Sequence, residues 1–137
     1  MPDKCDKYFR LFDANANRCR EGLRVIEDTA RFVLGSEFLY KKARKLRHSV
    51  DKITRSLHFD LVRKRDSISD SGRKIREGKR EDLLAVTASN FKRVEESLRV
   101  LEEYSRLIKP EAGPKFKKLR FSVYSFEKRF LKAYAPA

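Results

Sequence analysis

Apolar residues recur at spacings of three and four along most of the chain. Between residues 7 and 34 they form one stripe, which consists of Phe12, Ala16, Cys19, Leu23, Ile26, Ala30 and Val33. This spacing places them on one face of an α-helix. Val25 and Phe32 widen the stripe, so we expect this helix to contact two neighbours. Gly35 and Ser36 follow as a helix stop and as the N-cap of a new helix.

The same pattern predicts three further helices, over about 37–57, 81–108 and 115–134. Their expected inward residues are Leu39, Ala43, Leu46, Val50, Ile53 and Leu57, then Leu84, Phe91, Val94, Leu98, Leu101 and Ile108, then Phe116, Leu119, Val123, Phe126 and Phe130. A break is predicted at residues 109–114, where two prolines and a glycine occur. The polar stretch 59–80 predicts a long loop, and loops of that length are usually functional or mobile.

The two halves of the chain resemble each other. A shift of 75 aligns Asn15, Arg18, Glu21, Leu23, Arg24, Val25, Glu27 and Arg31 with Asn90, Arg93, Glu96, Leu98, Arg99, Val100, Glu102 and Arg106. A shift of 73 aligns the sequences KLR at 45–47 and at 118–120. We therefore predict one all-α domain, a four-helix bundle built from a duplicated helical hairpin. Repeat one covers about 7–58, the loop 59–80, and repeat two 81–134.

The charge of the chain narrows its partners to anions. Its 137 residues include 34 Lys and Arg against 20 Asp and Glu, a formal net charge of +14. Such a field attracts nucleic acid, acidic membranes or phosphorylated small molecules.

The chain contains no apolar run long enough to span a bilayer and no signal-peptide pattern at its start. Its two cysteines fit no metal motif. Because we expect an unexported, cytoplasmic protein, we also expect its thiols to be reduced and free.

The repeat also conserves polar residues that a shared core does not explain. These residues are Glu21, Arg24 and Arg31 in the first half and Glu96, Arg99 and Arg106 in the second. One interpretation is a solvated face with local ion pairs, each worth about 0.2–0.5 kcal/mol. The other is a pair of facing polar surfaces, on which arginines hold phosphate oxygens and carboxylates hold Mg²⁺ or a hydroxyl group.

Other polar residues carry similar alternatives. Asn15 and Asn90 either tie helices together or read the edge of a heterocycle. Asp66 and Asp70, beside Gly72, either shape a turn or meet a nucleotide-bound Mg²⁺. His48 is either structural or, beside an arginine, a phosphate ligand. The sequence lacks the Gly-rich loops that cradle phosphates in common nucleotide-binding proteins.

Residues 13–32 (DANANRCREGLRVIEDTARF) resemble the opening motif of a helical bacterial domain that is often fused ahead of thiamine phosphate synthase. This domain is regarded as a monofunctional hydroxymethylpyrimidine phosphate kinase. Further stretches resemble the same family: LRH at 46–48, RDSISDSG at 65–72, NFKRVEESLRVLEE at 90–103, and Leu119-Arg120 with Tyr124 and Glu127. The likeness covers about 8–130, and Ala16, Ser71 and Phe121 depart from the expected pattern. The synthase barrel is missing, which suggests a stand-alone version.

The resemblance implies ATP-dependent phosphorylation of hydroxymethylpyrimidine phosphate to its diphosphate, with Mg²⁺, in thiamine biosynthesis. The attacking atom is then a substrate phosphate oxygen, so positioning and charge neutralisation suffice. We assign catalytic roles to Arg24, Arg99, Glu27 and Glu102, and metal binding to Asp66 and Asp70. The residues assigned to substrate and nucleotide binding are Asn15, Asn17, Arg18, Arg20, Glu21, Asp28, Arg47, His48, Arg65, Asn90, Arg93, Glu96 and Arg120.

Two rival functions remain open at this level. The lysine-rich segments at 41–45 and 115–120 favour a basic helical nucleic-acid-binding protein, although no recognition motif is present and we expect no specific nucleic-acid partner. Fusion in the related proteins favours a non-catalytic adaptor of thiamine phosphate synthase. The expected partners are ATP and the phosphorylated pyrimidine, with no membrane. The sequence does not decide whether the chain forms a complex with thiamine phosphate synthase or a homodimer.

Overall fold

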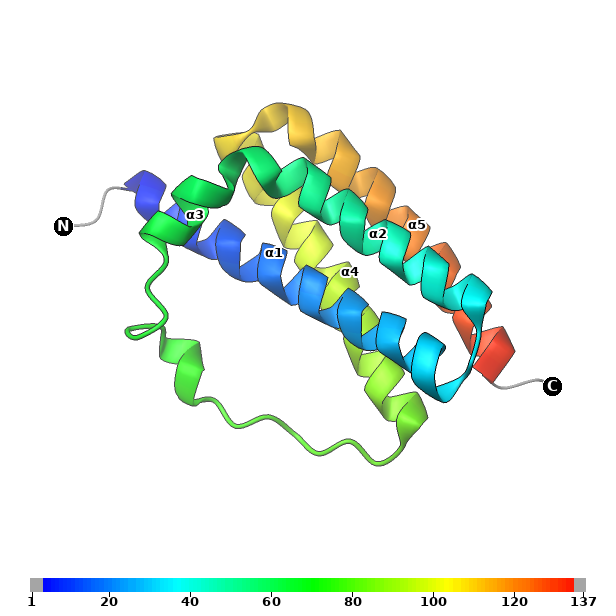
Figure 1. Cartoon of the computed structure of the whole chain (residues 1–137). Helices are drawn as coiled ribbons and strands as arrows, with labels where there is room; N and C mark the ends of the chain where they lie inside the picture. The colour runs from blue at the N-terminus through cyan, green and yellow to red at the C-terminus, as the bar shows by residue number, and fades with distance from the viewer. Residues whose placement is uncertain (1–3, 135–137) are drawn as a thin grey trace.

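The computed structural model describes residues 4–134 as a bundle of four long helices with shorter helices at their ends (Figure 1). The α-helices are α1 (Lys4–Asp28), α2 (Glu37–Thr54), α3 (His58–Lys64), α4 (Leu83–Ile108) and α5 (Gly113–Tyr134). The other helical segments are the π-helix η1 (Thr29–Val33) and the 3-10 helices η2 (Arg55–Leu57), η3 (Ser71–Lys74) and η4 (Pro110–Ala112). The prediction of an all-α bundle is confirmed.

The two hairpins, α1–α2 and α4–α5, pack against each other mainly through α1 and α4. Six of the seven predicted stripe residues of α1 are at most 1% exposed. On the other side of the core, the ring of Phe91 lies 5.6 Å from that of Phe126 and 5.4 Å from that of Phe130. Edge-to-face contacts of this kind add to the stability that burial of the rings provides.

Two predicted core residues are exposed instead. Val33 is 61% exposed because it lies in η1, where the Leu34 amide donates to the Thr29 carbonyl at 3.0 Å. This wider turn rotates the following side chains away from the α-helical face. Leu84 is 39% exposed in the first turn of α4. Val25 and Phe32, which we expected to widen the stripe, are also exposed, although α1 does contact both α2 and α4.

The turn between α1 and α2 follows the sequence prediction. Gly35 has a φ of 63°, a left-handed conformation that favours glycine. The Ser36 hydroxyl accepts a hydrogen bond from the Leu39 amide at 3.2 Å and so caps α2.

The connection between the hairpins begins later than the sequence predicts. Residues 58–64 form α3, which Leu61 anchors with a side chain that is only 2% exposed. A helix of seven residues is too short to show a periodic stripe, which is why the pattern favoured a loop. The segment from Arg65 to Asp82 bends at residues 67–69 and forms η3, and in Figure 1 it runs along the side of the bundle away from α2 and α5.

Cys19 is a free, buried cysteine, as the sequence predicts. Burial raises the pKa of its thiol to about 12, so it stays protonated and unreactive. The side chain of Cys5 lies outside the part of the chain that the structure describes. Within residues 4–134, no helix has the length and apolar character needed to cross a bilayer.

Candidate functional site

Two hollows adjoin each other along the exposed side of α1. The first, of about 560 Å³, lies between α1 and the segment 65–70, and we call it the loop hollow. The second, of about 490 Å³, lies between α1 and α4, and we call it the α1–α4 hollow. Asn15 and Arg18 line both. The cations around the two are Lys7, Arg10, Arg18, Arg65, Lys92 and Arg93, and the acids are Asp13, Asp66, Asp70 and Glu96.

A two-pronged ion pair fixes the wall of the loop hollow. The Arg65 guanidinium donates to both carboxylate oxygens of Asp13, at 2.7 Å and 2.8 Å. Asp13 is 4% exposed, so this carboxylate is almost fully removed from water and needs its partner. The pair joins α1 to the start of the connection, fifty-two residues further along the chain. It therefore holds the segment 65–70 over the hollow.

Asp66 and Asp70 shape the segment that closes this hollow. Asp66 accepts hydrogen bonds from the amide and the hydroxyl of Ser69, and these bonds lower the pKa of its carboxyl group. Asp70 accepts from the Gly72 amide at 2.8 Å and caps η3. Both predicted metal ligands thus line the hollow with exposed side chains. Among residues 4–134 no three His, Cys, Asp or Glu side chains form a group that could hold a metal alone.

Asn15 and Arg18 form the junction between the hollows. The Asn15 amide donates to the Leu11 carbonyl at 2.9 Å, and its oxygen accepts from Arg18 at 3.4 Å. Asn90, at the equivalent position of the second repeat, donates to the Val86 carbonyl at 2.8 Å in the same way. These bonds hold each amide on its own helix, so among the described residues neither amide makes the bond between helices that one interpretation expected. That either amide reads the edge of a heterocycle stays a prediction.

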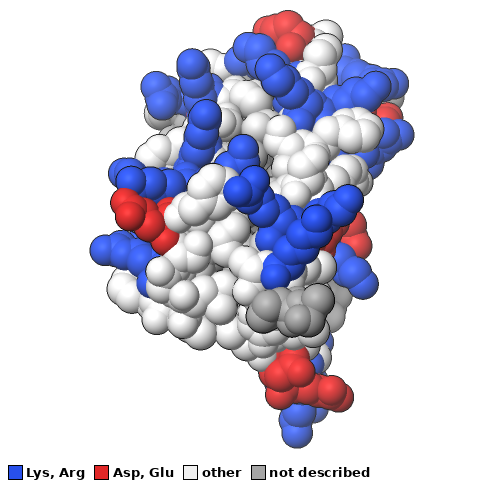
Figure 2. All heavy atoms as spheres, turned by 90° about the vertical axis from the view of Figure 1, so that its right-hand side faces the viewer, with Lys and Arg blue, Asp and Glu red and all other residues white. Residues whose placement is uncertain are grey.

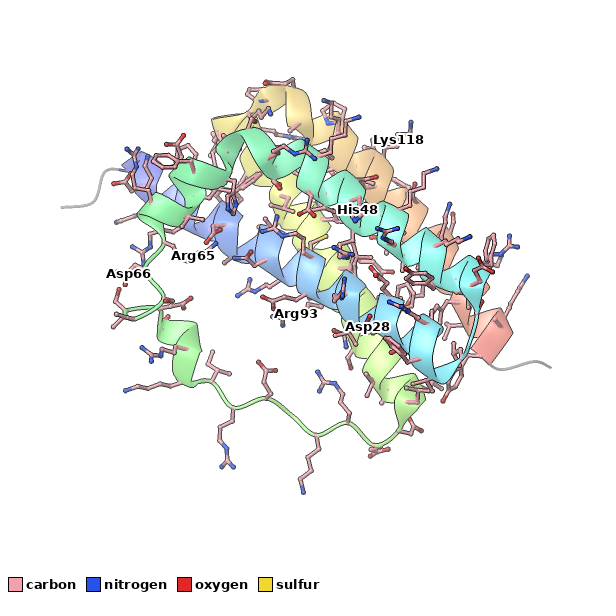
Figure 3. All side chains as sticks on the ribbon, viewed as in Figure 1. Asp28, His48, Arg65, Asp66, Arg93 and Lys118 are labelled. Carbon is pink, nitrogen blue, oxygen red and sulfur yellow. The ribbon has the colours of Figure 1, made fainter. Side chains whose placement is uncertain are left out.

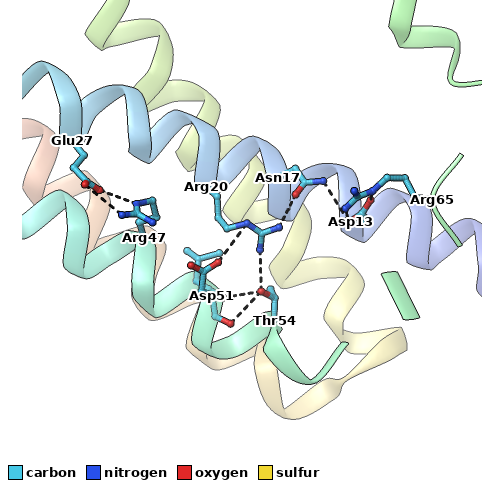
Figure 4. A network of polar contacts seen from close by, with 9 residues as sticks. Asp13, Asn17, Arg20, Glu27, Arg47, Asp51, Thr54 and Arg65 are labelled. Atoms are coloured by element: carbon cyan, nitrogen blue, oxygen red, sulfur yellow. Dashed lines mark hydrogen bonds and ion pairs between the residues drawn. The ribbon is translucent and has the colours of Figure 1, made fainter. Parts of the chain in front are cut away.

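Arg20 belongs to a polar network that links α1 to α2 (Figure 4). Its guanidinium lies 2.6 Å from the Asn17 oxygen, 3.2 Å from the Thr54 hydroxyl and 3.5 Å from Asp51. Asn17 in turn donates to Asp13 at 3.4 Å. The network therefore continues from α2 to the wall of the loop hollow.

The α1–α4 hollow is lined by charged residues from both repeats. Arg93 of α4 lies 3.7 Å from Glu21 of α1, while Glu96, the repeat equivalent of Glu21, lines the hollow beside Arg18. The helices approach closely at Gly22, where a Cβ atom would lie 2.7 Å from Val94 Cγ2 and 3.1 Å from the Asn90 carbonyl. Close packing of the two helices therefore explains the glycine.

The predicted catalytic residues form two matching ion-pair clusters away from the hollows. In repeat one, Glu27 accepts from Arg47 at 2.8 Å and lies 3.5 Å from Arg24. In repeat two, its equivalent Glu102 accepts from Arg120 at 3.0 Å and lies 3.5 Å from Arg99.

Both buried carboxylates therefore orient arginines, one from each helix of a hairpin. Arg24 also lies 3.6 Å from Asp28, and Arg99 lies 3.0 Å from Glu103. Arg24 and Arg99 line neither hollow, and their clamp role stays a prediction.

Figure 3 shows how the candidate residues divide between two sides of the molecule. Arg65, Asp66 and Arg93 lie on the side of the long connection, whereas His48 lies on α2. His48 lines a shallow hollow among lysines rather than either hollow described above. The site residues brought together around the two hollows are Asn15, Asn17, Arg18, Arg65, Asp66, Asp70, Arg93 and Glu96. Arg20, Glu21, Asp28, Arg47, Asn90 and Arg120 serve contacts between or along helices.

Sequence reasoning missed Lys7, Arg10, Asp13 and Lys92 as lining residues. A signal for three of them was present, because residues 7, 10 and 13 precede Asn17 at helical spacing and share its side of α1. Nothing in the spacing of Asp13 reveals its distant partner Arg65.

Glu95 of α4 and Glu127 of α5 form a pair of carboxyl groups between these two helices. Burial raises the pKa of Glu95 to about 8, and a hydrogen bond with Glu127 and the charges of Glu127 and Glu96 act in the same direction. The nearby Lys92 acts against them. The repeat equivalents of Glu95 and Glu127 are Arg20 and Thr54, so an Arg–Thr contact in one half is replaced by a carboxyl pair in the other.

With the geometry described, comparison with known proteins identifies the family. A model of the ThiD2 family matches residues 10–129. The chain belongs to the ThiD2 family. It is 39% identical over 127 residues to a thiamine-phosphate synthase of Nostoc punctiforme, a match that covers 90% of this chain and 35% of the relative.

Other relatives give the same picture. The chain is 42% identical over 123 residues to a thiamine-phosphate synthase of another Nostoc strain, covering 87% of this chain and 34% of the relative. A thiamine-phosphate synthase of Rhodopirellula baltica is 35% identical over 120 residues, with 85% and 32% covered. This ThiD2 chain thus spans about a third of the length of these relatives. No solved structure matches it.

Proposed function

We propose that this chain transfers the γ-phosphoryl group of ATP to hydroxymethylpyrimidine phosphate, forming the diphosphate in thiamine biosynthesis. The observation that carries the proposal is the pair of adjoining hollows that meet at Arg18 and Asn15. A kinase must hold two phosphorylated molecules side by side, and both volumes lie within the range of about 300–1,000 Å³ typical of small-molecule sites. Membership of the ThiD2 family and the name of its relatives support the pathway.

The chemistry requires little from the protein beyond position and charge. A phosphate oxygen of the pyrimidine attacks the γ-phosphorus of ATP, and the bond from this phosphorus to the bridging oxygen breaks. ADP leaves with the electron pair of that bond. Because the attacking oxygen is already ionised at neutral pH, no general base is needed, and charge neutralisation lowers the barrier.

The arginines around the hollows are the residues that neutralise this charge. Arg18 is exposed at the junction, and among residues 4–134 its guanidinium makes one hydrogen bond, the long one to Asn15. Its guanidinium can therefore turn toward a phosphate in either hollow. Arg93 reaches the α1–α4 hollow from α4. Arg65 lines the loop hollow from the connection, but its guanidinium is already paired with Asp13 and holds the wall in place. A guanidinium donates two parallel hydrogen bonds to a phosphate, which fixes its orientation as well as its charge.

Asp66 and Asp70 are the residues that would hold Mg²⁺. Two carboxylates are too few for a metal cage, but Mg²⁺ usually binds to one or two carboxylates together with substrate phosphates and water. The hydrogen bonds from Ser69 keep the pKa of Asp66 low, so the carboxylate is ionised at neutral pH. A Mg²⁺ ion brought by ATP would neutralise charge on the phosphate groups.

The direct test is to incubate the purified chain with ATP, MgCl₂ and hydroxymethylpyrimidine phosphate and to follow the diphosphate by ³¹P NMR. We expect stoichiometric diphosphate and ADP. Folded protein that gives no product would contradict the kinase and favour a non-catalytic partner of thiamine phosphate synthase.

A matched pair of variants tests the junction. We expect Arg18→Gln to lower kcat/KM by at least about tenfold, since a hydrogen bond to a charged group contributes about 1.5–3 kcal/mol and tenfold corresponds to about 1.4 kcal/mol. Arg44→Gln removes an exposed arginine of α2, away from both hollows, and controls for net charge. Equal kcat/KM for the two variants would contradict the role of Arg18.

Full activity of folded Arg24→Gln and Arg99→Gln would contradict a phosphate clamp at those residues.

A further inference from the structure

The positive charge of the chain is concentrated far from the proposed site. Within its described bounds, α5 carries seven Lys and Arg against one acid, and α2 carries six against two. In contrast, α1 carries six against five, and α4 carries four against four. The excess therefore belongs to α2 and α5, which lie on the side of the bundle away from the long connection (Figure 1). The two hollows do not account for it.

The basic side chains converge on a groove between α2 and α5. It has a volume of about 630 Å³, and its charged lining consists of Lys42, Lys45, Lys52, Lys115 and Lys118. Ser49 and Ser122 add hydroxyl groups, and none of the described residues that line the groove is an acid. An adjoining hollow of about 860 Å³, lined among others by Lys128 and Arg129, shares Lys42 and continues the groove toward the end of α5.

The ammonium groups of these lysines have no partner in the part of the chain that the structure describes. Among residues 4–134, none of the five ammonium groups makes a hydrogen bond or ion pair, in contrast to that of Lys41, which pairs with Glu37. Figure 2 shows Lys and Arg covering much of the upper part of the molecule, with few acids between them. Like charges that converge between low-dielectric walls repel each other and create a strong positive potential in the groove. A bound anion would reduce this repulsion. The groove is therefore built for an extended anion.

Three features favour a nucleic-acid strand over other anions. Lysine is depleted in the cores of protein–protein interfaces, where arginine and aromatic residues are enriched, so an acidic protein is a poor fit. A concave groove does not follow a flat membrane surface. The groove runs beside α2, whose eighteen residues extend about 27 Å, enough for several successive phosphates.

We propose that the α2–α5 groove binds the phosphate backbone of a single nucleic-acid strand without reading its bases. The described lining of the groove contains no aromatic side chain and therefore offers no platform on which bases could stack. In the adjoining hollow, Arg129 covers the ring of Phe38 at 4.2 Å. Lysines act as point charges toward phosphate, which gives affinity without sequence information.

The experiment measures binding of the full chain to a fluorescein-labelled twenty-nucleotide strand by fluorescence anisotropy between 50 and 200 mM KCl. Five lysine–phosphate contacts on a single strand predict a slope of log K against log[salt] of about −3.5. An oligothymidine and a mixed-sequence RNA of equal length are expected to bind equally. A large preference for one sequence would overturn binding through the backbone alone.

Matched variants locate the binding. Lys45→Gln/Lys118→Gln removes two groove charges, and Lys74→Gln/Lys79→Gln removes two exposed charges from the connection. We expect the first variant to bind at least about tenfold more weakly at 0.1 M salt, with the slope reduced by about 1.4, and the second to bind like the unaltered chain. Equal losses in both variants would overturn the groove. A competition assay compares unlabelled oligonucleotide with polyglutamate of equal charge. If polyglutamate displaces the labelled strand equally well, the choice of nucleic acid is overturned in favour of an acidic protein.

Discussion

Arg18 and Arg20 lie two residues apart on α1 but have different tasks. The Arg20 guanidinium meets Asn17, Asp51 and Thr54, so the protein already uses its donors. Arg18 is exposed and has one long hydrogen bond, so its donors remain available to a ligand. The number of contacts that an arginine already makes therefore separates residues that hold helices together from residues that can bind phosphate.

At the same scale, Glu95 predicts how stability depends on pH. Its pKa in the folded chain, about 8, lies above the ordinary value of 4.5, so the folded state keeps a proton that the unfolded state loses between these values. The stability that this proton provides is complete below about pH 4.5 and is lost as pH rises through 8. Glu95→Gln resembles the protonated form. We expect its Tm to equal that of the unaltered chain at pH 5 and to exceed it by a few degrees at pH 9.

Thermal unfolding followed by circular dichroism from pH 5 to 9 measures this difference. Glu111→Gln removes an exposed acid of η4 and serves as the control, with a constant offset across the range. Parallel curves for Glu95→Gln and the unaltered chain would show that the carboxyl group of Glu95 is not perturbed.

The sequence could predict which charged residues recur, but not what each one touches. Arg24 and Arg18 recur equally in the repeat, yet Arg24 pairs with Glu27 and Asp28 whereas Arg18 faces the hollows. The difference depends on the rotation of α1 relative to its neighbours. A face that packs on no other helix has no apolar pattern from which that rotation could be read.

At the scale of the elements, each hairpin is fastened by the same buried carboxylate. Glu27 and Glu102 are 3% and 5% exposed, and each holds an arginine of the second helix in its hairpin. Removing such a charge leaves the arginine without its partner in a half-buried position. We expect Glu27→Gln and Glu102→Gln each to lower the free energy of unfolding by about 1.5–3 kcal/mol.

Urea denaturation of the two variants and of Glu37→Gln tests this equivalence. Glu37 pairs with Lys41 on the exposed surface of α2, and its loss is expected to leave the urea midpoint nearly unchanged. If only one of the variants Glu27→Gln and Glu102→Gln were less stable than the Glu37→Gln control, the two hairpins would not be held together in the same way.

The four long helices followed from periodicity because each buries a wide stripe of apolar residues. The short elements did not, and their causes are local. The π-helix η1 depends on altered backbone hydrogen bonds, such as the one from the Leu34 amide to the Thr29 carbonyl, and α3 depends on the burial of Leu61. Neither feature extends over enough residues to leave a periodic signal.

At the scale of the whole molecule, the hairpins are joined by one exposed connection and by the α1–α4 interface. The segment 73–80 contains Arg73, Lys74, Arg76, Lys79 and Arg80, all exposed. We expect trypsin to cut there first, because the other basic residues lie mostly on helices that resist the enzyme. Since α1 and α4 bury each other's apolar faces, the two fragments are expected to stay together.

Size-exclusion chromatography after brief digestion measures this. One peak that contains both fragments, and that separates in urea, is the expected result. Fragments that separate without denaturant would mean that the connection itself holds the halves together.

The shared position of Arg18 has a consequence for the order of events at the two hollows. A single guanidinium cannot give its full set of donors to two anions at once. Occupation of one hollow therefore changes the charge that the other presents, and the two ligands sense each other without any movement of the helices. Saturation by the first ligand would then set the apparent affinity for the second, a linkage that is reciprocal by thermodynamic necessity.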